Sequence, residues 1–148
     1  MVVYLASDHA GFHLKEELKT YLESLRYAVE DYGNIRYEPE DDYPDFVRPL
    51  AEKISEDHEQ NRGIIIGGSG EGEAIVANRI AGVRAVVWYG KNEKIIQLSR
   101  EHNDANILSI GARFVEPEEA KRAVKLWLET PFSREFRHER RIDKIDKN

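Results

Sequence analysis

The first residues that could carry out chemistry lie in the run Ser7-Asp8-His9-Ala10-Gly11, which follows an apolar segment at the start of the chain. A carboxylate and an imidazole at such a point can hydrogen-bond a polar substrate, although Asp8 could equally cap the helix that follows. His9 and His13 are four residues apart, but the sequence offers no third metal ligand near them. A structural or catalytic zinc needs three or four ligands, so we predict no metal ion here.

A glycine-rich segment, Gly-Gly-Ser-Gly-Glu-Gly-Glu at residues 67–73, follows the most apolar run of the chain. Glycines let backbone N–H groups approach a ligand closely, and the start of a helix favours negative charge. The segment lacks the Gly-Lys-Ser/Thr ending of a nucleotide-binding P-loop, and plain turn chemistry would also explain its glycines. Glu73 could be a general base beside this loop, or a surface acid that complements the helix dipole.

A third polar segment, His102-Asn103-Asp104-Ala105-Asn106, lies between a predicted helix and a predicted strand. His102 could transfer protons near neutral pH, although a single loop histidine often has no such role. Arg113 follows the strand, and its guanidinium could grip a phosphate with two hydrogen bonds. Arg137 and Arg141 are four residues apart, so they share one face of a predicted helix.

Short apolar runs alternate with amphipathic stretches from one end of the chain to the other, which predicts strands alternating with helices. The predicted strands are Val2–Ala6, Ala28–Tyr32, Gly63–Ile66, Arg84–Trp88 and Asn106–Ile110. The predicted helices cover residues 14–25, 43–55, 71–80, 92–101 and 117–128. Each crossover between parallel strands needs a helix. We therefore predict an α/β fold: a three-layer, Rossmann-like, doubly wound, five-stranded parallel sheet with a C-terminal helical tail.

The tail, residues 131–148, is predicted to form a last helix from Ser133 onward. Basic residues outnumber acidic ones in it, whereas the whole chain has a formal net charge of −6. The helix is polar on most faces, so we expect that it cannot dock by burying a stripe in its own domain. Phe132 and Phe136 would give it apolar contacts on a neighbouring subunit.

Ligands of doubly wound sheets bind beyond the carboxyl ends of the strands, near the point where the strand order reverses. The three polar segments fall at the ends of predicted strands. We therefore expect them to converge on one site.

The composition is that of one globular domain spanning residues 1–148. The chain is 41% hydrophobic and 34% charged, and no apolar run approaches the roughly 20 residues that cross a bilayer. Its start lacks the basic lead of a signal peptide, so we expect a cytoplasmic protein that does not bind membranes. The absence of cysteine excludes disulfides and thiolate nucleophiles. The negative charge argues against nucleic acid as a partner.

Three motifs lie in register along nearly the whole chain. They are Ser-Asp-His-Ala-Gly at 7–11, Gly-Gly-Ser-Gly-Glu-Gly-Glu at 67–73 with Ala-Asn-Arg at 77–79, and Leu-Ser-Arg-Glu-His-Asn-Asp-Ala-Asn-Ile-Leu at 98–108. Gly111-Ala112-Arg113 and the pair Arg137 and Arg141 follow them. In order and spacing, the chain resembles the family of ribose-5-phosphate isomerase B and galactose-6-phosphate isomerase.

The resemblance implies the interconversion of ribose 5-phosphate and ribulose 5-phosphate through a cis-enediolate, without metal or cofactor. Many members of the family carry a cysteine base where this chain has Gly67. This chain has no cysteine, and it resembles the branch whose base is a glutamate, which maps to Glu73. One carboxylate could then move the proton between C2 and C1, because both carbons of the planar cis-enediolate present the same face to it.

The resemblance also assigns the remaining roles. His102 would assist ring opening, and Asp8 would meet the ring oxygen or hydroxyls. The charge on the enediolate oxygens would be stabilised by Ser69, by the backbone amides of Gly68, Ser69, Gly70, Glu71 and Gly72, and by Asn103. The phosphate would be held by His9, Arg113, Arg137 and Arg141, part of this set coming from a second subunit. The implied assembly is a homodimer, or a tetramer, with shared sites.

Two alternatives and one question stay open. A six-carbon substrate such as allose or galactose 6-phosphate differs by one carbon, which a pocket resolves by only about 1–3 kcal/mol. A non-catalytic nucleotide- or phosphate-binding module on the same fold would need the glycine-rich loop, but not Glu73, His102 and Asn103 together. The helix start would lower the pKa of Glu73 and burial would raise it, and the sequence does not decide between them.

Overall fold

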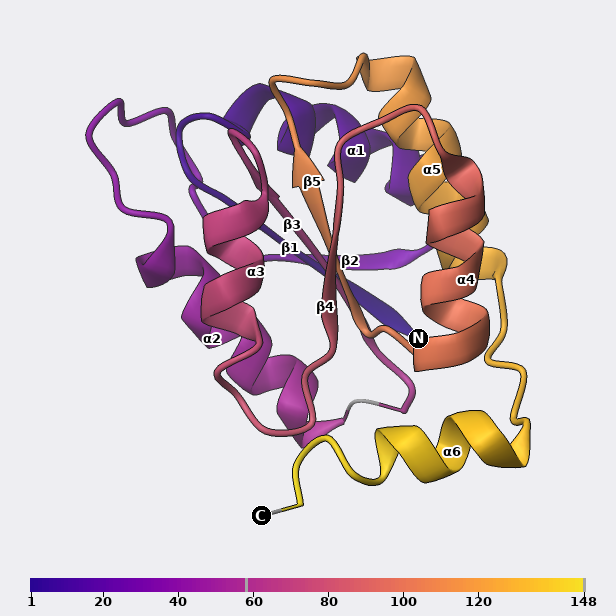
Figure 1. Cartoon of the computed structure of the whole chain (residues 1–148). Helices are drawn as coiled ribbons and strands as arrows, with labels where there is room; N and C mark the ends of the chain where they lie inside the picture. The colour runs from indigo at the N-terminus through magenta and orange to yellow at the C-terminus, as the bar shows by residue number, and fades with distance from the viewer. Residues whose placement is uncertain (58, 148) are drawn as a thin grey trace.

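The computed structural model describes residues 1–57 and 59–147, and in these residues five parallel strands form one sheet of order β2-β1-β3-β5-β4. Helices cover both faces of the sheet (Figure 1). The predicted fold class is confirmed. The strands are β1 (Val2–Ser7), β2 (Ala28–Asp31), β3 (Arg62–Gly67), β4 (Ala85–Trp88) and β5 (Ile107–Gly111).

Each face of the sheet has its own apolar core. Successive side chains of a strand point to opposite faces, so a central strand must be apolar throughout. Ile64 and Ile66 of β3 accordingly pack into one core, while Ile65 packs into the other. The first core lies under α1 (Phe12–Ser24), α4 (Glu93–Asn103) and α5 (Pro117–Glu129). The second lies under α2 (Pro44–Glu56) and α3 (Glu71–Ala77).

The topology reverses direction at the carboxyl ends of β1 and β3. From β1 the chain crosses to β2 at one edge, and from β3 it crosses past β5 to β4 at the other edge. The strand order therefore reverses between β1 and β3, which is where ligands of such sheets bind. The loop that begins with Asp8 and the glycine-rich loop flank this point. The end of β5 adjoins it as well, because Gly67 pairs with Gly111.

The C-terminal helix α6 (Phe136–Ile142) packs against α4 of its own chain, below the sheet in Figure 1. His138 anchors it and is only 2% exposed. The N–H of Ser133 donates to the carbonyl of Glu101 at 3.1 Å. The expectation that this helix cannot dock on its own domain is therefore wrong. A buried histidine, with backbone hydrogen bonds around it, replaces the apolar stripe.

Two further findings concern the helices. The helix predicted over residues 71–80 ends earlier, at Ala77, because the side chain of Asn78 bonds both the N–H and the carbonyl of Ala85. No helix among the described residues is long and apolar enough to cross a membrane.

Candidate active site

The carboxylate of Glu73 lies over the end of β3. Glu73 stands in the first turn of α3, and it is only 4% exposed because its side chain folds back toward Gly67. A Cβ placed on Gly67 would overlap this carboxylate, so a glycine at the end of β3 is what makes room for it. The sequence singled out Gly67 and Glu73, but it did not show that the Glu73 carboxylate occupies the volume beside Gly67.

Burial decides the pKa of Glu73. Desolvation raises it above the ordinary value of 4.5, and the nearby charge of Asp8 acts in the same direction. A hydrogen bond from the backbone N–H of Glu73 itself opposes the rise without cancelling it. The question that the sequence left open is answered in favour of burial. A carboxylate with a raised pKa is a stronger base than one in water.

The glycine-rich loop joins the end of β3 to the helix that carries Glu73. Gly70 has a φ of 81°, which only glycine adopts without strain, and its carbonyl accepts a hydrogen bond from Ser109 Oγ at 2.5 Å. Ser69 Oγ accepts the N–H of Glu71 at 3.3 Å. Among the described residues, the N–H groups of Ser69 and Gly70 have no protein acceptor. Such amides could bind a developing oxyanion.

Arg113 lies across the same loop. The Cζ of its guanidinium would be 3.2 Å from a Cβ placed on Gly68. The backbone N–H of Arg113 donates to the Gly68 carbonyl at 3.1 Å. The Arg113 side chain is exposed, and a guanidinium beside this loop suits an anionic group. The structure thus brings Arg113 together with the glycine-rich loop, as predicted.

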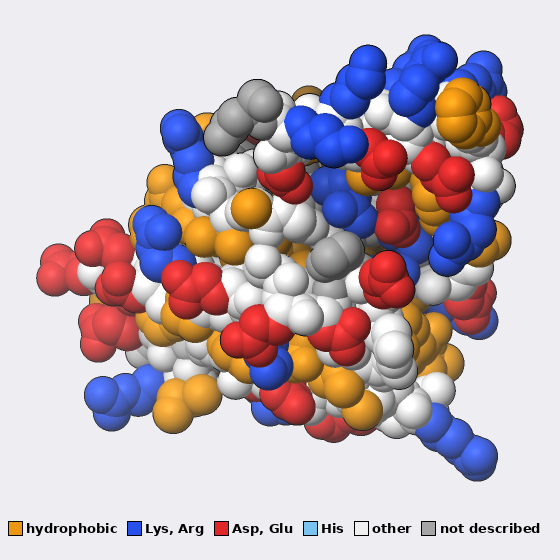
Figure 2. Space-filling view, turned by 90° about the horizontal axis from the view of Figure 1, so that it is seen from below, with side chains coloured by type: hydrophobic (Ala, Val, Ile, Leu, Met, Phe, Trp, Pro, Cys, Tyr) orange, Lys and Arg blue, Asp and Glu red, His pale blue; other side chains and the backbone are white. Residues whose placement is uncertain are grey.

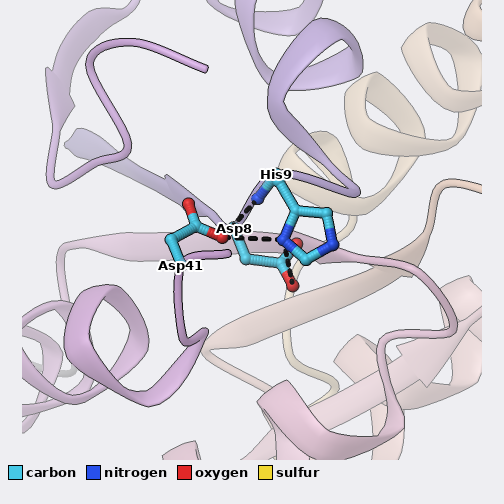
Figure 3. A group of neighbouring side chains, drawn as sticks. All are labelled: Asp8, His9 and Asp41. Atoms are coloured by element: carbon cyan, nitrogen blue, oxygen red, sulfur yellow. Dashed lines mark hydrogen bonds and ion pairs between the residues drawn. The ribbon is translucent and has the colours of Figure 1, made fainter. Parts of the chain in front are cut away.

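Asp8 and His9 follow the carboxyl end of β1 (Figure 3). Asp8 Oδ1 accepts the N–H groups of Ala10 and Gly11 at 3.0 and 3.3 Å, so Asp8 stabilises the turn before α1, whose own N-cap is Gly11 and has no side-chain cap. Its Oδ2 lies 3.9 Å from His9 Nδ1. Stabilising this turn and a role in the site are compatible, because they use different oxygens of Asp8.

Asp41, which sequence reasoning missed, joins these two residues. Its Oδ1 lies 2.8 Å from His9 Nδ1 and accepts the His9 N–H at 2.9 Å, while its Oδ2 accepts from Asn34 Nδ2 at 2.8 Å. Ligand atoms of Asp8, His9 and Asp41 lie within 4.8 Å of one another, a grouping that could hold a metal ion. Hydrogen bonds account for the grouping without an ion. No spacing signal could reveal Asp41, which lies 32 residues from His9.

His13, which the sequence considered beside His9, stacks on Tyr37 with ring centroids 5.8 Å apart. It is not part of the grouping around His9.

His102 and Asn103 do not join this site within one chain. They end α4, which runs back along the sheet and leads into the amino end of β5. Arg137 and Arg141 lie on α6 at the same end, opposite the glycine-rich loop (Figure 1). The three segments therefore do not converge within one chain. A segment that precedes a parallel strand lies at its amino end, and ligands bind at the other.

The residues at the amino end form a second polar group. The rings of His102 and His138 lie 4.3 Å apart, and His138 Nδ1 lies 3.0 Å from Ser133 Oγ. Arg137 and Arg141 are exposed, and the Arg137 Nε bonds Glu135 at 2.9 Å. Figure 2 views this end and shows Lys and Arg side chains gathered over α6, at the upper right.

Comparison with known proteins decides the family. The model of the family described as Ribose/Galactose Isomerase matches residues 3–145. The chain belongs to this family. It is 42% identical to the ribose-5-phosphate isomerase B of Mycolicibacterium paratuberculosis over 97% of this chain and 88% of that relative. It is 40% identical to the one of Mycobacterium tuberculosis, over 97% of this chain and 86% of the relative.

Solved structures of this family have the same fold. The ribose-5-phosphate isomerase B of Mycoplasma genitalium, with bound ribulose 5-phosphate, matches with a TM-score of 0.92 at 37% identity, covering 97% of this chain and 92% of that one. The enzyme from Thermotoga maritima matches with a TM-score of 0.90 at 40% identity, covering 99% and 97%.

Proposed function

We propose that this family member is an enzyme that interconverts ribose 5-phosphate and ribulose 5-phosphate, with Glu73 as the base. The observation that carries the assignment of the base is the buried Glu73 carboxylate, which lies in the space that a side chain at position 67 would need. The names of the relatives and the bound ribulose 5-phosphate of the Mycoplasma genitalium structure support the substrate.

The reaction needs one mobile proton on carbon and one on oxygen. Glu73 removes the proton from C2 of the open aldose to give a cis-enediolate and returns it to C1, while the proton of the O2 hydroxyl passes to O1. C1 is reduced as C2 is oxidised, so no external oxidant is consumed. The N–H groups of Ser69 and Gly70, which lack protein acceptors among the described residues, would stabilise the enediolate oxygens. Asp8 would meet the ring oxygen or hydroxyls.

The site is completed by a second copy of the chain. One chain carries Asp8, His9, Glu73 and Arg113 at the carboxyl ends of its strands, and His102 with the arginines of α6 at the amino ends. In a homodimer, or a tetramer of such dimers, the amino end of one subunit would cover the carboxyl-end site of the other. Phe136 is 75% exposed on α6 and would supply an apolar contact for this docking.

The roles then divide between subunits. His9 and Arg113 would hold the phosphate together with the partner subunit's Arg137 and the partner subunit's Arg141. The partner subunit's His102 would assist ring opening, and the partner subunit's Asn103 would bind an enediolate oxygen.

The decisive experiment is an assay of the purified protein. Ribose 5-phosphate, allose 6-phosphate and galactose 6-phosphate are compared by kcat/KM. The highest value for ribose 5-phosphate is expected. A higher kcat/KM for a six-carbon phosphate would assign that sugar phosphate as the substrate instead. Turnover of none of the three would overturn the proposal.

A further inference from the structure

Asp41 stands outside the elements that carry the other site residues. It lies in the connection between β2 and α2, and its side chain is only 6% exposed. Its carboxylate makes two hydrogen bonds with His9 and one with Asn34. The buried Asp41 carboxylate therefore serves mainly to fix the position of His9.

The geometry fixes the ring of His9 as well as its backbone. A single oxygen, Asp41 Oδ1, accepts the His9 N–H at 2.9 Å and lies 2.8 Å from Nδ1 of the same residue (Figure 3). The second oxygen is held by Asn34 Nδ2, so the carboxylate itself cannot rotate freely. With Nδ1 engaged, Nε2 points away from Asp41 on the far side of the ring (Figure 3).

The charges around His9 favour its cationic form. The hydrogen bond to Asp41 raises the pKa of His9 above the ordinary value of 6.5; the charges of Asp8 and Asp41 add to the rise, while burial and Arg113 oppose it. Burial alone would raise the pKa of Asp41, but the hydrogen bonds from His9 and Asn34 lower it overall. Asp41 therefore remains an anion, and His9 keeps its proton to a higher pH than a free histidine.

We propose that Asp41 is a positioning residue that orients His9, through Nδ1, so that Nε2 donates as a cation to the substrate phosphate beside Arg113. The inference rests on the proposed function, because it requires a phosphate-bearing substrate. It adds a residue that does not touch the substrate and acts only through His9.

The first test compares Asp41→Asn with Asp42→Asn, a matched control in which an exposed neighbour loses the same charge. A charged hydrogen bond is worth enough to change affinity by roughly 10-fold, so KM for ribose 5-phosphate should rise about that much in Asp41→Asn. The kcat should change little, because the chemical step does not involve His9. An unchanged KM in Asp41→Asn, or an equal rise in Asp42→Asn, would overturn the proposal.

The second test separates positioning from a merely structural role. The ring protons of His9 are titrated by NMR and assigned by their loss in His9→Gln. The pKa of His9 should lie above 6.5 in the natural chain, fall in Asp41→Asn, and be largely restored in Asp41→Glu. The ratio of KM between Asp41→Asn and the natural chain should then grow from pH 5.5 to pH 7.5, because the variant loses its cation first. Phosphate titrates near pH 6 in both proteins and cancels in the ratio.

The proposal stays testable if the variant does not fold or if the natural chain is inactive. If Asp41→Asn does not fold, the pKa of His9 in the natural chain decides, and a value at or below 6.5 overturns the proposal. If the natural chain isomerises no sugar phosphate, the proposed function fails, whereas the His9 titrations still report on the pair. An unchanged His9 pKa in folded Asp41→Asn contradicts the proposal in either case.

Discussion

The two acids at the carboxyl ends of the strands, Asp8 and Glu73, are buried, whereas the arginines of the site are exposed: Arg113 beside the two acids, and Arg137 and Arg141 at the amino ends. Glu73 and Asp8 are almost inaccessible, and His9 is held by Asp41. Arg137 and Arg141 of α6 are exposed, and Figure 2 shows Lys and Arg side chains gathered at this end of the molecule. Groups that move protons need a low-dielectric, preorganised setting, whereas groups that complete another subunit's site must remain accessible until it docks.

Loss of the base should give the largest effect. In Glu73→Gln, kcat should fall at least about 100-fold, because a placed base contributes 10²–10⁴-fold. Substrate should still bind, since the amide keeps the size of the carboxylate. Glu93→Gln, which changes an exposed acid in the first turn of α4, is the control. Steady-state kinetics and calorimetric binding check both, and near-normal turnover of Glu73→Gln would remove Glu73 from its role.

Loss of both tail arginines tests the other end of the sheet. In Arg137→Ala/Arg141→Ala, KM should rise steeply while the fold is kept, because both side chains are exposed. Arg122→Ala, an exposed cation on α5, should have no such effect.

Mixing this double variant with Glu73→Gln chains sharpens the comparison. If sites are shared, heterodimers contain one site with an intact base and intact arginines, so activity should exceed that of both parents. Activity no higher than that of either parent after subunit exchange would mean that each chain supplies its own arginines.

A methyl group at position 67 should disturb the Glu73 site at the carboxyl end of β3 and leave the residues at the amino ends of the strands unchanged. In Gly67→Ala, the new Cβ overlaps the Glu73 carboxylate, so we expect about 1–3 kcal/mol of destabilisation and a marked loss of kcat. Denaturant unfolding and kinetics measure the two effects. The double variant Gly67→Ala/Glu73→Ala should recover stability because the clash is gone, and simple additivity of the two changes would contradict a shared space.

The smallest expected effect is an upward shift of the acid limb in the pH profile of kcat. Glu73 must be ionised to act, and its pKa is raised by burial, so kcat should fall on acidification through a pKa above 4.5. The profile of kcat is the proper measure, because it reports ionisations in the enzyme–substrate complex. An acid limb at or below 4.5 would show that the carboxylate is not desolvated when substrate is bound.

Much of the fold could be predicted from the sequence, and the reasons are local. The apolar run of β3 and the spacing of apolar residues in α1 and α5 indicated strands and helices directly. The strand order β2-β1-β3-β5-β4 could not be predicted, because it depends on which edges pair across the whole sheet. The docking of α6 was misjudged because one buried histidine leaves no periodic pattern.

The candidate site was predictable where motif and strand end coincide, as at Asp8 and Glu73. The sequence analysis did not show that His102 lies at the amino end of β5, because the segment was treated as a strand end without its direction. Asp41 escaped notice because it lies among other acidic residues in an irregular segment. Only the tertiary fold shows which of these acids is buried against His9.

The shared space of Gly67 and Glu73 also constrains how such a protein can change. A thiol at position 67, which the family resemblance implies for many members, and a carboxylate in the pose of Glu73 are alternative occupants of one volume. A side chain at position 67 therefore displaces the Glu73 carboxylate from its present place, so one chain does not hold both bases in position. A lineage exchanging one for the other must pass through a glycine without a partner base, or accept a distorted intermediate. Positions 67 and 73 should consequently vary together among descendants, as a linked pair rather than as two independent sites.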